Sequence, residues 1–154
     1  MFNSLIPTDR FLPKAYLGKW YEINRFPVEY TDCPNASAFY ELAKDGGRNT
    51  IKVTNMCYDK NWRIISAIEG KASLTEKNNE LIVSFGPLNI QPVPEESNYI
   101  VHAVKYNEWA LVGSSSKKTL YILSRMKCLE KDTYDAILSL CVIFGYDISR
   151  FVKK

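Results

Sequence analysis

The sequence predicts a single domain of the all-β class, either a sandwich or a barrel, and three observations support this prediction. Eight short strand-like runs follow one another at short spacing and are separated by turn residues. The 154 residues include 10 tyrosines, 7 phenylalanines and 3 tryptophans, and aromatic residues favour strands. Gly18 and Trp20 open the first run and Arg125 ends the eighth, so a closed sheet would bring the indole and the guanidinium into contact.

The order of the elements follows from local signals along the chain. Residues 1–14 are expected to form an irregular arm, because Pro7 and Pro13 discourage regular structure. Residues 15–125 are expected to form the sheet. Its eight predicted strands lie at residues 16–26, 36–43, 49–58, 62–74, 79–85, 97–104, 108–115 and 118–125.

Turn and helix signals complete the chain. An Asp-Gly-Gly turn at residues 45–47 joins the second and third strands, and residues 86–94, with three prolines, predict a long loop. After the eighth strand, apolar residues recur at helical spacing, which predicts one amphipathic helix at residues 130–144 that ends before Gly145. A short extra strand is expected at residues 146–152.

Composition and charge argue against several classes of protein. A net charge of +3, spread along the chain, does not favour nucleic acid as a partner. No apolar run approaches the roughly 20 residues of a membrane-spanning helix. The first residues, up to Pro7, are too few and too soon interrupted to form a signal peptide. With one histidine, His102, and no Cys-x-x-Cys spacing, we expect no metal site, and nothing implies a cofactor.

Alternation within the strands places small residues beside aromatic or branched ones on one face. Ile68 and Gly70 share a face of the fourth strand, and Tyr99, Val101 and Ala103 share a face of the sixth. A packed sandwich would favour uniformly bulky residues, whereas a barrel with space inside tolerates small ones there. The pattern therefore favours a barrel.

Several motifs occur together in one order along the chain. They are Tyr16-Leu17-Gly18-Lys19-Trp20-Tyr21-Glu22-Ile23, Asp45-Gly46, Glu69-Gly70-Lys71-Ala72, Ser84-Phe85-Gly86-Pro87, Leu120-Tyr121-Ile122-Leu123-Ser124-Arg125 and Gly145-Tyr146-Asp147. In this order they resemble the lipocalin family, and within it the branch of bacterial outer-membrane lipoproteins and apolipoprotein D. The resemblance implies an eight-stranded up-and-down antiparallel β-barrel with one C-terminal α-helix packed on its wall.

The resemblance also implies roles for single residues. Gly18, Trp20 and Arg125 would close one end of the barrel as structural residues, and the other end would open to a ligand cavity. Two features depart from the family pattern. The chain reads Val104-Lys105-Tyr106 where the family usually has Thr-Asp-Tyr, and the loop at residues 86–96 is longer and richer in proline.

The resemblance anchors the phase of the strands, and alternation then predicts which residues face the cavity. Most of them are apolar, with a few hydroxyl groups and one amide, as an acyl chain with a polar head requires. Alternatively, the bulky members fill the interior as an ordinary core. The predicted lining residues are Ala38, Tyr40, Leu42, Ile51, Val53, Asn55, Ser66, Ile68, Gly70, Val83, Phe85, Tyr99, Val101, Val112, Ser114, Tyr121 and Leu123.

This lining predicts a protein that binds and transports or stores a small hydrophobic ligand, a fatty acid or lysophospholipid, without catalysis. No buried cationic residue is evident, so Arg25, Arg48 or Lys52 near the rim would hold a carboxylate, or the head group would stay in water. Peripheral membrane association is left open. Two alternatives are a lipocalin-fold isomerase of a lipid or prenyl substrate and a module that binds a partner through its loops. An outward-facing His102 and the absence of a cavity thiol argue against the enzyme.

The cysteines bear on stability and location. Cys33 and Cys57 flank the predicted turn at residues 45–47, and pairing about this turn would place them within disulfide distance. Relatives in the bacterial branch often carry a similar pair, and the alternative is two unlinked buried thiols. Cys141 is expected in the core as a small residue of the helix. A disulfide favours a secreted or periplasmic, outer-membrane-associated mature form over a cytoplasmic protein that starts at Met1.

Overall fold

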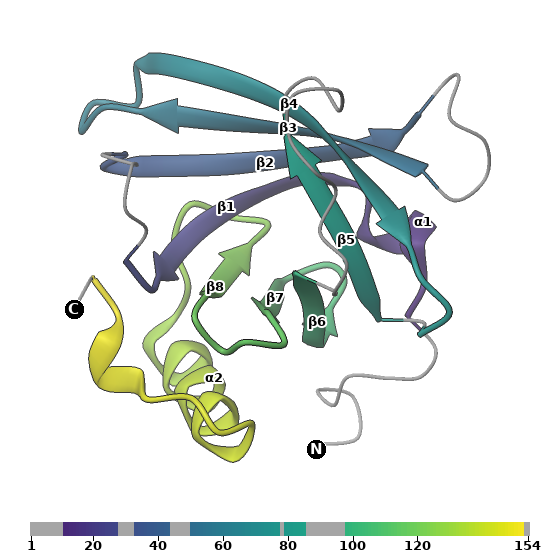
Figure 1. Cartoon of the computed structure of the whole chain (residues 1–154). Coiled ribbons are helices and arrows are strands. Elements are labelled where there is room, and N and C mark those ends of the chain that lie inside the picture. Colours follow the sequence, from purple (N-terminus) through teal and green to yellow (C-terminus); the bar gives the residue numbers. More distant parts are fainter. Residues whose placement is uncertain (1–10, 28–32, 44–49, 78, 86–97, 153–154) are drawn as a thin grey trace.

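The computed structural model describes residues 11–27, 33–43, 50–77, 79–85 and 98–152. These residues form a closed barrel of eight strands that follow one another in sequence order (Figure 1). Each strand pairs antiparallel with the next, and the first pairs with the eighth to close the sheet. The predicted up-and-down barrel is therefore confirmed, and the sandwich is excluded.

The strands match the predicted ones to within two residues at either end. The predicted turn at residues 45–47 and the long loop at residues 86–96 lie outside the described residues. The strands are β1 (Gly18–Arg25), β2 (Asn35–Leu42), β3 (Thr50–Tyr58), β4 (Ile64–Leu74), β5 (Glu80–Phe85), β6 (Tyr99–Lys105), β7 (Trp109–Gly113) and β8 (Leu120–Ser124).

A short helix, α1 (Pro13–Tyr16), precedes the barrel where an irregular arm and the start of a strand were predicted. Proline fits the first turn of a helix, because its missing N–H would be unpaired there. The N–H groups of Ala15 and Tyr16 donate to the carbonyl of Leu12. Gly18, with φ +102°, then turns the chain into β1, and α1 lies at the end of the barrel where β1 begins (Figure 1). Most of the predicted arm, residues 1–10, lies outside the described residues.

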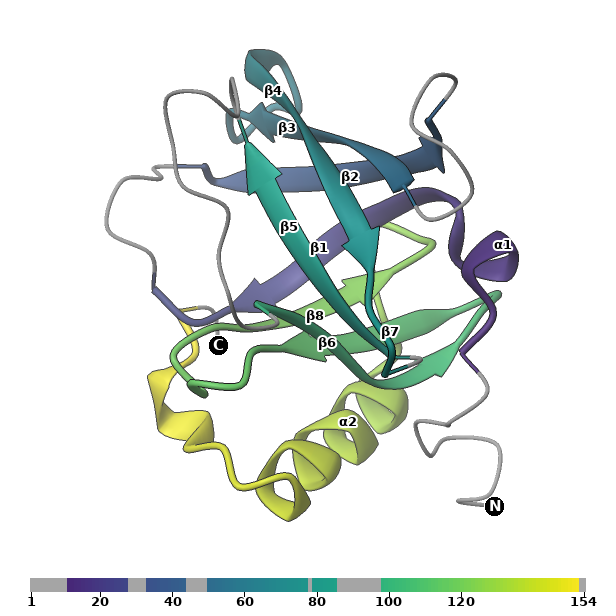
Figure 2. The same cartoon turned by 45° about the vertical axis from the view of Figure 1, so that its right-hand side comes forward.

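The predicted C-terminal helix is present as α2 (Lys131–Ile143), and it packs on the barrel wall as expected. Figure 2 shows it beneath β6, β7 and β8. At its end Gly145 has φ +90°, and the N–H of Tyr146 donates to the carbonyl of Cys141 over 2.9 Å, as in a Schellman motif. The buried residues of this contact are Ile137, Leu140 and Cys141 from the helix and Ala103, Trp109, Leu111, Leu120 and Ile122 from the strands.

The prediction of an extra strand at residues 146–152 is wrong. The segment forms a 3₁₀ turn, η2 (Ile148–Arg150), because the carboxylate of Asp147 accepts a hydrogen bond from the N–H of Ser149 over 3.1 Å. Such side-chain bonds to the local backbone compete with strand pairing. The chain then returns to the barrel, where the N–H of Val152 donates to the carbonyl of Arg25.

His102 faces outward from β6, as predicted, and contacts the segment that follows α2. Its ring stacks on Phe144 with 4.7 Å between the ring centroids, and its Nε2 lies 2.6 Å from the hydroxyl of Tyr146. Burial, together with the positive charge of Lys117, lowers the pKa of His102 to about 4 from its ordinary value of 6.5. The histidine is therefore neutral at physiological pH and holds the C-terminal segment against the wall.

This depressed pKa predicts that the folded protein loses stability as the pH falls from 6.5 to 4. In that range the unfolded chain binds a proton at His102 that the folded chain does not bind. The stabilisation that comes from a neutral His102 is therefore complete above pH 6.5 and is lost as the pH falls to about 4. Because the ring is only half-buried, we expect a loss of about 2 kcal/mol. Urea titrations at pH 7.5 and 4.5 measure it. In His102→Gln the difference between the two pH values should shrink by that amount, and an unchanged difference would contradict the prediction.

Candidate functional site

The inner face of the barrel carries one hydrophobic cluster to which all eight strands contribute. Residues of the cluster are neighbours in the strand register: Tyr40 pairs with Val53, Ile51 with Ala72, and Ala72 with Val83. Directly opposed residues of an antiparallel pair point to the same side of the sheet, so these side chains share the interior. The candidate site is this interior. The interior is closed at the end of the barrel where β1 begins, around Trp20, and this closed end is called the floor.

The floor is built around Trp20, which is fully buried. The guanidinium carbon of Arg125 lies 3.7 Å from the centroid of the indole, so the contact expected between the first and eighth strands is present. Arg125 also donates to the carbonyls of Lys19 and Tyr106 over 2.9 Å and of Ala15 over 3.1 Å. Its donors thus bind the backbone of three separate segments, which is a structural arrangement.

Three tyrosines lie together next to Trp20. The hydroxyl of Tyr99 is 2.5 Å from that of Tyr16 and 2.8 Å from that of Tyr40. Burial raises the pKa of all three phenols, so they stay neutral at physiological pH. Tyr40 and Tyr99 are predicted lining residues. Tyr16 is not among them, because the sequence pattern places it in a strand, whereas it is the last residue of α1.

Most of the predicted lining residues face this interior, at two levels of burial. Six are buried members of the cluster: Tyr40, Ile51, Val53, Val101, Val112 and Leu123. Others pack against the cluster while only half-buried: Ala38, Val83, Phe85, Tyr99 and Tyr121. Asn55 and Gly70 are also half-buried and pair with Ala38 and Val53 in the register.

Leu42, Ser66 and Ile68 are predicted lining residues that the barrel does not enclose. Leu42 is 49% exposed, Ile68 is 50% exposed, and Ser66 is exposed as well. Among the described residues, each of them lies beyond the paired part of a neighbouring strand. β1 pairs with β2 only up to Tyr40, and β5 pairs with β4 only from Gly70 onward. Alternation gave the right side of the strand but could not show where the adjacent strand ends.

Ser114 is a further correction. β7 ends at Gly113, so Ser114 belongs to the turn before β8 and not to the inner face. Its hydroxyl accepts from the N–H of Thr119 over 3.4 Å and lies 3.2 Å from the hydroxyl of Ser116. The hydroxyl group therefore holds this turn.

The predicted disulfide joins Cys33 to Cys57, with 5.3 Å between the Cα atoms. Cys57 pairs in the register with Ala36 and Ser66, so the bridge fixes the start of β2 to the end of β3. The other two cysteines are free: Cys141 is buried in the helix, as expected, and Cys128 is exposed.

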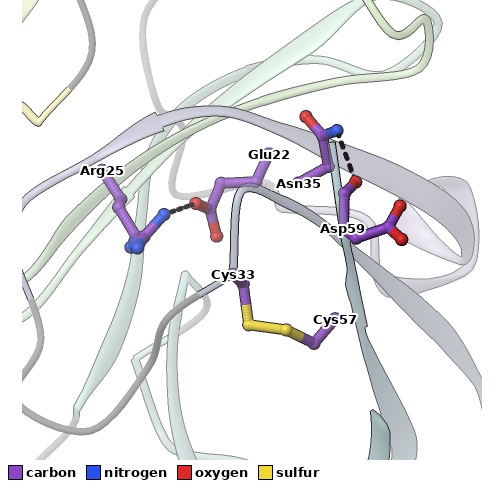
Figure 3. Close-up of a disulfide and its surroundings, with 6 residues drawn as sticks. All are labelled: Glu22, Arg25, Cys33, Asn35, Cys57 and Asp59. Carbon is purple, nitrogen blue, oxygen red and sulfur yellow. Dashed lines mark hydrogen bonds and ion pairs between the residues drawn. A yellow bond between two sulfur atoms is a disulfide. The ribbon is translucent and has the colours of Figure 1, made fainter. Parts of the chain in front are cut away.

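An ion pair lies beside the disulfide (Figure 3). The Nη1 atom of Arg25 is 2.7 Å from Oε1 of Glu22, and the two side chains are 11% and 12% exposed. Their register partners in β8 are Tyr121 and Leu123, which belong to the interior cluster. Arg25 and Glu22 therefore face the inside of the barrel.

The expectation that no cationic residue is buried is wrong for Arg25. Strict alternation from Trp20 would turn Arg25 outward, but a register shift between Glu22 and Asn24 reverses the phase. Asn24 instead donates to the hydroxyl of Tyr134 in α2, over 2.8 Å, on the outside.

The other two candidates for holding a carboxylate differ from Arg25. Lys52 is on the outer face, 3.1 Å from Glu69, and Arg48 lies outside the described residues. In the described part of the chain, no three His, Cys, Asp or Glu side chains gather closely enough to hold a metal ion. Within the same residues, no helix is long and apolar enough to cross a membrane.

Comparison with known proteins assigns the family. The model of the lipocalin-like domain matches residues 13–154. The chain is 33% identical to temperature-induced lipocalin-1 of Arabidopsis thaliana, over 91% of this chain and 76% of that protein. It is 32% identical to the outer membrane lipoprotein Blc of Escherichia coli, over 94% and 78%. A putative lipocalin of Acanthamoeba polyphaga mimivirus is 31% identical, over 92% and 82%.

A solved structure shows the same fold at a much lower sequence identity. Lobster apocrustacyanin superposes with a TM-score of 0.65 at 13% identity, over 99% of this chain and 91% of that one. The family model and the three relatives cover nearly all of the barrel and α2. This chain therefore belongs to the lipocalin family.

Proposed function

We propose that this protein binds a single-chain lipid, a fatty acid or a lysophospholipid, inside its barrel and transports or stores it without catalysis. Lipocalins generally bind small hydrophobic ligands. The supporting observation is the apolar inner face, whose members Ala38, Val83, Phe85 and Tyr121 point inward and are only half-buried. Side chains that face into a closed barrel and still contact solvent are suited to cover a guest molecule.

The energetics suit a single acyl chain. Each buried methylene contributes about 0.8 kcal/mol, so a chain of about 14 methylenes gains roughly 11 kcal/mol in gross terms. Ordering and association costs of several kcal/mol would leave micromolar or somewhat tighter binding. The binding free energy of the acyl chain therefore depends on the apolar area that is buried and not on specific polar contacts along the methylenes.

The positions of the nucleophilic and basic groups support binding rather than catalysis. His102 bonds to Tyr146 on the outer wall, and Cys141 lies between α2 and the barrel. Burial raises the pKa of the Cys141 thiol to about 12, so it is protonated and unreactive at physiological pH. Neither side chain faces the interior where a lipid would lie.

A displacement assay with a matched pair of variants tests the proposal. We expect the uncharged fluorophore N-phenyl-1-naphthylamine to bind one-to-one and dodecanoate to displace it. Ala38→Phe places a ring in the interior and should weaken binding of the fluorophore about tenfold or more, by removing the space for a guest. Thr54→Phe is the control, because it adds the same ring to the outer face of β3. Equal binding by the two variants, or failure of dodecanoate to displace the fluorophore, would contradict the proposal.

A further inference from the structure

We propose that Arg25 binds the anionic head group of the ligand inside the barrel, through the edge of its guanidinium that Glu22 leaves unused. The inference rests on the proposed function and narrows the ligand class to single-chain lipids with a carboxylate or phosphate head. Arg25 is one of three candidates near the rim in the sequence, and the register shift in β1 turns it into the interior.

The first observation is an unused hydrogen-bond donor. Arg25 is 9% exposed, and only one nitrogen, Nη1, bonds to Glu22. In the described part of the chain, its Nε is the one buried side-chain nitrogen or oxygen atom without a hydrogen-bond partner. A buried charged donor without an acceptor is destabilising, whereas an oxygen anion on that edge would relieve the cost. The Nε edge of a guanidinium also matches the two oxygens of a carboxylate or phosphate.

The second observation is the position of Arg25 in the barrel. It ends β1, five residues after Trp20, so at most roughly 16 Å of strand separates it from the floor. Apart from Glu22, the inner face beside this stretch is apolar in the two adjacent strands, where Leu123 of β8 and Val112 of β7 are buried. A head group at Arg25 would therefore leave this apolar stretch for the acyl chain. The disulfide between Cys33 and Cys57 lies beside Arg25 and Glu22 (Figure 3).

Arg125 and the three tyrosines near the floor already have partners for their polar groups. The guanidinium of Arg125 donates to backbone carbonyls and covers the Trp20 ring. The hydroxyls of Tyr16, Tyr40 and Tyr99 bond to one another and carry no charge. Among the described residues, Arg25 thus combines a positive charge, an inward position and a free donor.

Removal of the Glu22 charge is expected to raise the affinity for an anionic lipid, whereas removal of the Arg25 charge is expected to lower it. Its carboxylate fixes the guanidinium through Nη1, but its negative charge also repels an incoming anion and competes for the same cation. Removing that charge should strengthen the binding of an anionic lipid. A pair that only holds the barrel together would instead lose affinity for every ligand when either partner is changed.

Competition against N-phenyl-1-naphthylamine at pH 8 tests this with dodecanoate, dodecyl phosphate and the uncharged dodecanol. In Arg25→Gln we expect the affinity for the anionic lipids to fall about 10- to 100-fold, and that for dodecanol to change less than about threefold. In Glu22→Gln the affinity for the anions should rise by about threefold or more. Lys71→Gln removes the same charge from an exposed position of β4, and all three affinities should stay as in the wild type. A response of dodecanoate alone or of dodecyl phosphate alone would support the inference and identify the head group.

The outcomes separate this inference from the proposed function. If the wild type binds neither dodecanol nor the anions, the proposed function fails. If all bind but Arg25→Gln and Glu22→Gln leave the ratio of anion to alcohol affinity unchanged, only the role of Arg25 is overturned. A fall in the ratio of anion to alcohol affinity in Tyr99→Phe but not in Arg25→Gln would place the head group at the floor. That result would also overturn the role of Arg25. Should Arg25→Gln not fold, the rise expected in Glu22→Gln decides alone.

Discussion

Replacing Trp20 by alanine is expected to lower the free energy of unfolding by about 4 kcal/mol, the largest effect of any single substitution that we predict. The indole is fully buried at the floor, and its removal leaves a cavity that the rigid ends of eight strands cannot fill. The substitution also removes the cation–π contact with Arg125 and the hydrogen bond from Nε1 to the carbonyl of Tyr16, 2.8 Å long. The guanidinium would then lie over an empty space.

Two further variants separate the contributions to this loss. Trp20→Phe keeps an aromatic ring under Arg125 but removes the Nε1 donor, and it should cost about 1–2 kcal/mol. Phe39→Ala removes an aromatic ring from the outer face of the neighbouring β2, where it is exposed, and should cost about 1 kcal/mol or less. Urea unfolding followed by circular dichroism gives all three values. A cost for Trp20→Ala no larger than that for Phe39→Ala would show that the floor does not depend on this residue.

The course of the barrel was predictable because its signals are local and repeated. Strands with a period of two, separated by turn residues, gave all eight strands in order, and the helical spacing before Gly145 gave α2 and its end. The pairing of the two ends followed from Trp20 and Arg125, whose side chains attract each other only if the sheet closes. Apart from the contact between Trp20 and Arg125, these predictions required no information on contacts between distant parts of the sequence.

What the sequence did not predict depends on register and on neighbours. The shift between Glu22 and Asn24 turns Arg25 inward, and a second shift between Val101 and Ala103 places Ala103 against α2 instead of the interior. A bulge adds one residue without a distinctive sequence signal, so alternation loses its phase there. The interior ion pair was missed for this reason.

Loss of the disulfide is expected to produce the second largest effect on stability. Cys33 and Cys57 are 24 residues apart, and closing a loop of that length lowers the entropy of the unfolded chain by an amount worth about 3 kcal/mol. The double variant Cys33→Ser with Cys57→Ser should therefore unfold at a free energy about 3 kcal/mol below that of the oxidised wild type, and dithiothreitol should lower the wild type by a similar amount. Cys128→Ser, at an exposed free cysteine, is the control and should change stability by less than about 0.5 kcal/mol.

The same variant tests whether the bridge also shapes the interior. The bridge lies beside Glu22 and Arg25 (Figure 3). Trp20 at the floor has its own contacts, among them the hydrogen bond to the carbonyl of Tyr16. If the disulfide acts through the unfolded chain alone, the folded variant should bind N-phenyl-1-naphthylamine and dodecanoate as the wild type does, at a temperature where it is fully folded. A selective loss of dodecanoate would show that the bridge also holds β2 and β3 in the positions that the Arg25 site requires. Equal stability of the double variant and Cys128→Ser would refute the chain-entropy account.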